Sequence, residues 1–288
     1  MIRSWLFVPG DSERKFARAS QGEADALILD LEDSVAPAAK EAARGTTRAM
    51  LEAPRGRQRR WVRVNALDTG LTLGDLAAVM PARPDGIVLP KCADAAMVRQ
   101  VAHWLDAFEA AHGIAAGTTR ILAIATETAS SLFGLGGYGA AGPRLAGLTW
   151  GAEDLSASIG STASRDGGAW LGPYALARNL CLAGAAAAGV PAYDTVHVDI
   201  EDIAGLEADS RAAKRDGFAG KMVIHPSHVA PVNAVFAPSA EELDWARRVV
   251  AAFASGEAGA MRMDGKMLDR PHLRLAERLL AAGGGSAS

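Results

Sequence analysis

Two acidic residues follow consecutive runs of β-branched and apolar residues, and their positions suit a divalent cation. Glu127 follows residues 121–125, and Asp154 follows residues 147–150. Parallel strands of a barrel end at one mouth, so carboxylates after neighbouring strands can share one ion. Oxygen ligands without a Cys or His cluster favour Mg²⁺, or Mn²⁺, over Zn²⁺. A structural carboxylate paired with an arginine is the alternative at each position, and the residue pattern leaves both open.

Other charged residues also lie at the ends of apolar runs, where they would surround such an ion. Asp30, Glu32 and Asp33 end or follow the second run, Arg63 lies in the third, and Lys91 follows the fourth. The acidic residues could orient waters on the metal, or orient the two basic side chains. Alternatively, they form a charge cluster in front of a helix.

Basic residues near the N-terminus could meet an anionic ligand. Arg14 and Arg18 are four positions apart in a helical segment and therefore share one face. Phosphate is a natural ligand for such a pair, whereas a solvated helix face is the alternative. His225, which precedes Pro226, is either a base or a hydrogen-bonded structural residue at a strand end.

The elements that would position these residues alternate between strand-like and helix-like patterns. Helical stretches, one of them at residues 130–135, separate the strand-like runs. Eight repeats of this kind favour a TIM (β/α)₈ barrel over an open doubly wound sheet. The eight runs are residues 5–8, 26–31, 61–64, 86–89, 121–125, 147–150, 195–198 and 222–224.

After residue 236 the pattern changes, which predicts a barrel over residues 1–236 and a C-terminal helical extension over 237–288. Ser239 should cap a helix that runs to Phe253, with Glu242 at the capping-box position. A flexible joint at 255–260 then leads to a helix at about 271–282, and the Gly-rich tail should be disordered. A helix on such a joint is a lid, an arm that reaches another subunit, or part of the packing.

Composition argues against several classes of partner. The 288 residues carry a net charge of −3, so neither a nucleic-acid surface nor a polybasic membrane anchor is indicated. Cys92 and Cys181 lack the spacing of a disulfide framework or a zinc site, which fits a cytoplasmic location. The expected partner is a small molecule or another protein.

Several motifs, in order along nearly the whole chain, resemble the citrate lyase β-subunit-like family, which includes malyl-CoA and citramalyl-CoA lyases. These motifs are RSWLFVPG at 3–10, LDLED at 29–33, VRVN at 62–65, TET at 126–128, GAEDL at 151–155, AYDTV at 192–196, GFAGK at 217–221 with IHP at 224–226, and MLDRP at 267–271. The chain departs from the family in having Arg14 and Arg18 where Lys is frequent, and Leu268 where Ile is common.

The resemblance implies a barrel enzyme that uses Mg²⁺, acts on CoA or carrier-protein thioesters and often forms a homotrimer. It implies that Glu127 and Asp154 bind the metal and that Arg63 contacts the oxo acid or thioester oxygen. It also implies an acid/base role for Asp269, commonly performed in a neighbouring subunit. The residues implied to line the CoA and substrate site are Phe7, Arg14, Arg18, Ile224 and His225.

These features lead to the hypothesis of a reversible Claisen-type cleavage of a citramalyl-, malyl- or citryl-CoA type substrate to acetyl-CoA and a 2-oxo acid. Arg63 would stabilise an enolate and Asp269 would deliver the proton to it. One alternative is a thioester hydrolase on the same scaffold. The other is a citrate lyase β subunit that acts on an acyl carrier protein within a complex.

Overall fold

The computed structural model describes residues 2–254 and 260–284. The chain divides into two compact units, Ile2–Asn233 and the described residues from Ala234 onward, and each is treated by itself. Of the joint predicted at 255–260, residues 255–259 lie outside the described residues, as do residues 285–288 of the predicted disordered tail.

Eight parallel strands of the first unit close into a barrel, which confirms the predicted fold class. Each strand pairs with its successor, and the last pairs with the first through the register Trp5 to Met222. The barrel strands are β1 (Ser4–Pro9), β2 (Ala26–Asp30), β3 (Arg59–Arg63), β4 (Gly86–Leu89), β5 (Arg120–Ile124), β6 (Leu145–Thr149), β9 (Ala192–Asp194) and β10 (Gly220–Val223).

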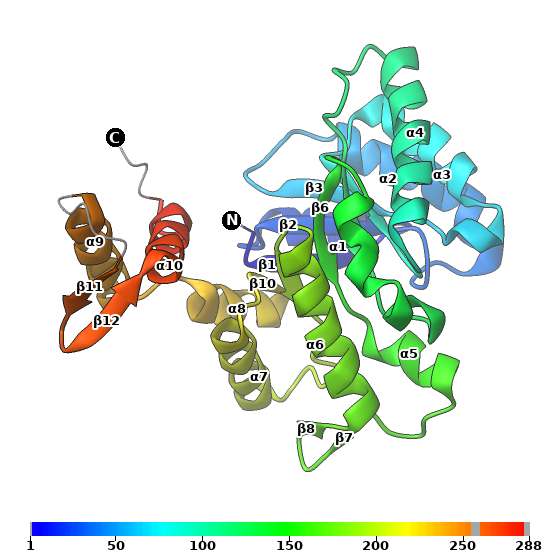
Figure 1. Ribbon diagram of the computed structural model, residues 1–288. Coiled ribbons are helices and arrows are strands. Elements are labelled where there is room, and N and C mark those ends of the chain that lie inside the picture. Colours follow the sequence, from blue (N-terminus) through cyan, green and yellow to red (C-terminus); the bar gives the residue numbers. More distant parts are fainter. Residues whose placement is uncertain (1, 255–259, 285–288) are drawn as a thin grey trace. The chain divides into compact units, whose positions relative to one another are not determined.

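Helices surround these strands (Figure 1). Within the part of the chain that the structure describes, no helix has the length and apolar character needed to cross a bilayer. The α-helices of the first unit are α1 (Glu13–Ser20), α2 (Lys40–Glu52), α3 (Thr72–Val79), α4 (Ala95–Ala111), α5 (Ala152–Ile159), α6 (Gly172–Ala187) and α7 (Ile203–Asp216), and α8 (Val229–Phe236) crosses into the second unit. The 3-10 helices are η1 (Pro37–Ala39), η2 (Leu67–Thr69), η3 (Met80–Ala82), η4 (Ser130–Phe133), η5 (Leu135–Ala140) and η6 (Pro226–His228).

Large aromatic side chains fill the barrel interior. The ring of Trp5 meets the rings of Trp61 and Tyr193 edge to face, each at 5.0 Å between centroids. These side chains are almost fully buried, and burial of each stabilises the fold by roughly 1.5–3 kcal/mol. Gly86 on β4 leaves room for Trp61, because a Cβ there would lie 2.2 Å from the indole atom Cζ3. The core therefore depends on a small residue next to a large one.

The seventh strand was predicted wrongly at residues 195–198, because the barrel strand is β9, which ends at Asp194. The β-branched residues that suggested a strand belong to the following loop, where Val198 is 60% exposed. Likewise, the helix predicted at 130–135 consists of η4 and part of η5, where glycines interrupt the chain. Helix α5 and the short hairpin of β7 (Arg165–Asp166) and β8 (Ala169–Trp170) were not predicted.

The second unit packs two helices with a hairpin. Its elements are α9 (Ala240–Ala254), the antiparallel strands β11 (Ala260–Met263) and β12 (Lys266–Asp269), and α10 (Arg270–Ala282). The predicted capping box is confirmed, since the Ser239 amide donates to Glu242 Oε2 at 2.7 Å and the Glu242 amide donates to Ser239 Oγ at 3.1 Å. Buried Ala246, Val249, Leu268 and Ala276 form the small core.

A single methyl group tests the packing of the barrel interior. Gly86→Ala places its Cβ against the Trp61 ring, and we expect a loss of about 2 kcal/mol in the free energy of unfolding. Gly136→Ala is the matched control, since a Cβ there meets no atom within 4 Å, and it should change stability by less than about 1 kcal/mol. Urea denaturation of both variants makes the comparison, and equal midpoints would contradict this account of the core.

Candidate functional site

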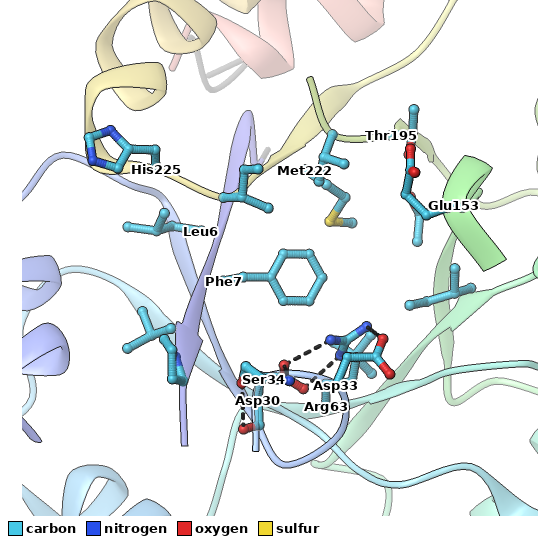
Figure 2. A pocket seen from close by; sticks show the side chains of 18 of the residues that line it. Leu6, Phe7, Asp30, Asp33, Ser34, Arg63, Glu153, Thr195, Met222 and His225 are labelled. Atoms are coloured by element: carbon cyan, nitrogen blue, oxygen red, sulfur yellow. Dashed lines mark hydrogen bonds and ion pairs between the residues drawn. The ribbon is translucent and has the colours of Figure 1, made fainter. Parts of the chain in front are cut away.

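A cavity of about 790 Å³ opens at the mouth formed by the carboxyl ends of the barrel strands. Its volume lies within the range of small-molecule sites. Phe7 of β1, Arg63 of β3 and Met222 of β10 line it, and Figure 2 shows the Phe7 ring between Met222 and the Arg63 guanidinium. The loops after β2, β5, β6 and β9 complete the wall. The positions follow from the barrel, which gathers its βα loops at this mouth.

Arg63 is fixed by a bidentate pair with Asp30. Its Nε donates to Oδ1 of Asp30 at 2.7 Å and its Nη2 donates to Oδ2 at 2.8 Å (Figure 2). Burial would lower the pKa of Arg63, but the charge and hydrogen bonds of Asp30 raise it. Burial opposes ionisation of Asp30 as well, yet the charge of Arg63 lowers its pKa. The pair is therefore ionised, and it anchors the guanidinium 4.8 Å from the Phe7 ring.

The remaining nitrogen of Arg63, Nη1, faces two further carboxylates. It lies 3.0 Å from Glu32 Oε2 and 3.3 Å from Asp33 Oδ2. Glu32 Oε2 is buried and accepts no hydrogen bond from the described residues, so its contact with Nη1 is an ion pair without hydrogen-bond geometry. The Asp33 side chain is 56% exposed, whereas only 11% of the Arg63 side chain is exposed.

Lys91 links the acidic loop after β2 to the loops after β5 and β6. Its ammonium donates to Glu32 Oε1 and lies 3.2 Å from Asp154 Oδ1, while its amide donates to Glu127 Oε2. Burial would lower the pKa of Lys91, but the hydrogen bond to Glu32 and the nearby carboxylates raise it. The backbone of Lys91 is left-handed, with φ of +49°, a strained conformation that directs the amide to Glu127.

Glu127 is almost fully buried, and its neighbours disfavour its charge. Burial is the largest cause of a pKa raised to about 8, and the charges of Glu32 and Asp154 add to it. Gly151 makes the space, because a Cβ there would lie 2.9 Å from Glu127 Cγ. Asp154 stands in the first turn of α5 with a third of its side chain exposed.

The donor set around Glu127 and Asp154 fits a hard divalent cation. Both supply oxygen, and in the described part of the chain neither forms an ion pair with an arginine, which was the structural alternative. A divalent charge would offset the repulsion that raises the pKa of Glu127. The described residues contain no group of three or more His, Cys, Asp or Glu suited to a metal. The other ligands would therefore be waters or substrate oxygens.

A basic edge of three residues, Arg14, Lys15 and Arg18, borders the same cavity. They lie on α1, whose Phe16 and Ala19 are buried against the barrel, so the basic side chains are left at the surface. The helical spacing predicted Arg14 and Arg18 as ligand contacts, but it did not indicate Lys15, which adjoins Arg14. The arginines thus border the cavity, and sequence spacing alone had left a purely solvated face open.

The end of β10 supplies Ile224 and His225 to the cavity wall. His225 begins η6, where its Nδ1 accepts from the Ser227 amide at 3.3 Å and lies 2.6 Å from Ser227 Oγ. It therefore has the hydrogen-bonded structural contact considered for it, in addition to its place at the cavity.

Trp150 is a wall residue that sequence reasoning missed. Its indole Nε1 donates to Asp194 Oδ1 at 2.8 Å, and the buried Lys221 ammonium donates to Asp194 Oδ2 at 2.7 Å. Trp150 directly precedes Gly151, the first residue of the GAEDL motif, and this position could have indicated that it lies at the cavity. Asp269, the last sequence-predicted residue, lies in the second unit at the start of α10.

Comparisons with known proteins give consistent matches. Residues 3–226 match the family described as HpcH/HpaI aldolase/citrate lyase, and residues 185–283 match that described as C-C bond lyase of the TIM-barrel fold. A citrate lyase subunit beta-like protein of Mycobacterium tuberculosis is 38% identical over 285 residues, covering 99% of this chain and 96% of the relative. A (3S)-malyl-CoA thioesterase of Cereibacter sphaeroides is 36% identical, covering 97% and 94%.

A solved structure is similar over nearly the whole chain. It is the protein CitE from Mycobacterium tuberculosis in complex with magnesium, acetoacetate and coenzyme A, with a TM-score of 0.77 and 37% identity. The match covers 98% of each chain.

The raised pKa of Glu127 predicts that, without divalent ions, the free energy of unfolding decreases as pH rises. The folded protein holds a proton on Glu127 up to about pH 8, whereas the unfolded chain releases it near 4.5, so stability falls as pH rises between these values. Glu127→Gln lacks this loss, and in chelator it should be more stable than wild type at pH 8 by more than about 1 kcal/mol. Denaturation at pH 5 and pH 8 tests this, with exposed Glu153→Gln as control. An equal difference at both pH values would refute it.

Proposed function

The chain belongs to the HpcH/HpaI aldolase/citrate lyase family, and we propose that it is an Mg²⁺-dependent acyl-CoA lyase. The proposed reaction is reversible cleavage of a 3-hydroxyacyl-CoA, of the citramalyl-, malyl- or citryl-CoA type, to acetyl-CoA and a 2-oxo acid. One observation carries the proposal. A single cavity joins the carboxylates Glu127 and Asp154 to the basic edge of α1.

Glu127 and Asp154 are the proposed Mg²⁺ ligands, supported by their oxygen donors and by magnesium in the similar CitE structure. An ion held there would bind the free carboxylate of the substrate and the hydroxyl beside it, which is the 3-hydroxyl of the acyl-CoA, and would make that hydroxyl more acidic. Glu32 and Lys91 would hold the pair in place, since Lys91 contacts Glu32, Glu127 and Asp154.

Arg63 is proposed to stabilise negative charge on the thioester oxygen or the oxo acid. Asp30 holds the Nε and Nη2 side of the guanidinium, which leaves Nη1 directed at the acidic loop and the cavity. A donor held in advance costs no reorganisation when charge develops on an oxygen beside it. Arg63 would act through this one nitrogen.

The basic edge is proposed to bind the phosphates of CoA, and Phe7, Ile224 and His225 to line the path of its pantetheine arm. Arg14, Lys15 and Arg18 are surface cations beside a cavity whose wall includes the apolar side chains Phe7 and Ile224, which suits a ligand with a charged end and an apolar arm. The coenzyme A in the similar CitE structure supports this assignment.

Asp269 is proposed as the acid that protonates the enolate of acetyl-CoA, and as the base that removes the methyl proton in synthesis. It caps α10 with its side chain 46% exposed, so a ligand can reach it. A homotrimer in which this residue serves a neighbouring copy stays a prediction.

A thioesterase is the second candidate, favoured by the relatives named (3S)-malyl-CoA thioesterase. Water would then attack the thioester carbonyl, and no carbon–carbon bond would break. Relatives named citrate lyase subunit beta, such as that of Leuconostoc mesenteroides at 33% identity, favour a carrier-protein thioester as the substrate form.

Product analysis separates these reactions. Incubation with Mg²⁺ and malyl-CoA or citramalyl-CoA should yield acetyl-CoA and glyoxylate or pyruvate, identified by mass spectrometry. Free CoA with an intact hydroxy acid would establish the thioesterase instead. Activity confined to a carrier-protein thioester would establish the complex-bound subunit.

If Glu127 and Asp154 hold Mg²⁺, removing either carboxylate should prevent binding of the 2-oxo acid. Glu127→Ala and Asp154→Ala should each abolish Mg²⁺-dependent binding of pyruvate or glyoxylate, because one carboxylate alone holds the ion weakly. Isothermal titration with and without chelator measures this. Exposed Asp166→Ala is the control. Equal oxo-acid affinity with and without chelator in wild type would reject the assignment.

The basic edge predicts a defect in CoA binding alone. Arg14→Ala and Arg18→Ala should each raise KM for the CoA thioester about three- to tenfold, with little change in kcat, because they contact the phosphates and not the reacting atoms. The effect should shrink at high salt. Arg48→Ala, which breaks only an exposed pair with Glu52, is the control, and an unchanged KM in both edge variants would contradict the role.

A further inference from the structure

Asp269 has an ionisable partner three residues along the chain. It ends β12 and caps α10, and His272 occupies the third position of the helix. His272 Nδ1 lies 2.7 Å from Asp269 Oδ1 and 3.2 Å from the Asp269 amide nitrogen. Both side chains are a little under half exposed. The two side chains are therefore in hydrogen-bond contact and open to a ligand or to solvent.

The geometry accommodates a proton on either side of this contact. With the proton on Nδ1, the imidazole donates to the Asp269 carboxylate. With the proton on Asp269, the carboxyl donates to the single lone pair of Nδ1, which it shares with the Asp269 amide at 3.2 Å; with the proton on Nδ1, that amide loses this acceptor. An unprotonated nitrogen facing a carboxylate at 2.7 Å would be repelled, so one proton belongs between them. The first arrangement is the base form of Asp269, and the second is its acid form.

We propose that His272 is a positioning residue for Asp269, holding its carboxyl group and exchanging a proton with it. This inference rests on the proposed acid/base role of Asp269. In cleavage, the O–H bond of Asp269 breaks as a C–H bond forms on the enolate carbon. Solvent then returns one proton to the pair through the exposed imidazole. In synthesis, the carboxylate takes the methyl proton, and the imidazole releases one to solvent.

Other charges in the unit are shared by wild type and variants, so they cannot explain a difference between them. Arg248 of α9 is paired with Asp244 and with Asp264 of the hairpin. The further charged residues of the elements packed with α10, and of α10 itself, are Glu241, Glu242, Arg247, Arg262, Lys266, Arg270, Arg274, Glu277 and Arg278. A change in the pH profile on replacing His272 therefore reports on the imidazole.

Two substitutions separate positioning from proton exchange. His272→Val removes the hydrogen bond and the ionisation, and it should lower kcat about tenfold while leaving KM for the thioester unchanged. His272→Asn can still donate to Asp269 but does not titrate. It should recover kcat to within about threefold of wild type, and its kcat should depend on pH differently from that of wild type, because the amide cannot exchange a proton. In an Asp269→Asn background, which alone should cost 10²- to 10⁴-fold, His272→Val should have no further effect.

Ser239→Ala is the matched control, since it breaks the capping box of the neighbouring helix α9 and leaves Asp269 and His272 in place. It should lower Tm while kcat and its pH profile stay as in wild type. The inference is overturned if an active wild type and His272→Val share the same kcat, or if His272→Asn is as impaired as His272→Val. A wild type that forms neither acetyl-CoA nor a 2-oxo acid overturns the proposed function, and the inference with it.

Discussion

The surplus of carboxylates at the mouth of the barrel is the constraint on which the site depends. Asp30, Glu32, Asp33, Glu127 and Asp154 meet there beside the cations Arg63 and Lys91. Asp30 is stabilised as an anion by Arg63, whereas burial and neighbouring charge keep Glu127 protonated until higher pH. Additional positive charge would therefore stabilise the site most between Glu127 and Asp154. This imbalance supports the proposed cation site, and the part of it that is already neutralised is the pair that anchors Arg63.

Two backbone positions allow Glu127 to sit among these carboxylates, and one of them, Lys91, is strained. Lys91 adopts a left-handed conformation that a lysine rarely occupies, and the gain is an amide hydrogen bond to Glu127. Gly151 has an ordinary φ, yet any side chain there would press against Glu127. Each residue is the second after a barrel strand, Lys91 after β4 and Gly151 after β6, so the strands fix where the two residues lie. The local strain is therefore maintained by the ring of strands beneath it.

The sequence predicted the barrel and most strand ends, because alternation of short apolar runs with helices is a local signal. The strand pattern alone therefore predicted that Glu127, Asp154, Arg63 and Lys91 lie at one mouth of the barrel. It misplaced the seventh strand, since the three residues of β9 are shorter than the β-branched stretch that follows them. The bridge from Lys91 to Glu32 and Asp154 joins residues far apart in the sequence, and only the closed barrel brings them within contact. The alternatives left open for Arg14 and Arg18 likewise needed the cavity.

The roles proposed for the two units differ, and the physical surroundings of the residues explain why. Charges at the barrel mouth are fixed by burial and by partners from several strands, which suits binding and charge stabilisation but hinders exchange of protons with water. Asp269 and His272 are instead close in sequence, partly exposed and held by a helix cap that forms locally. A proton that must enter and leave during each turnover is better handled by such a pair than by a buried carboxylate. If Asp269 is the acid, the contact that begins α10 has a second role, since it also joins that acid to an imidazole that can return its proton.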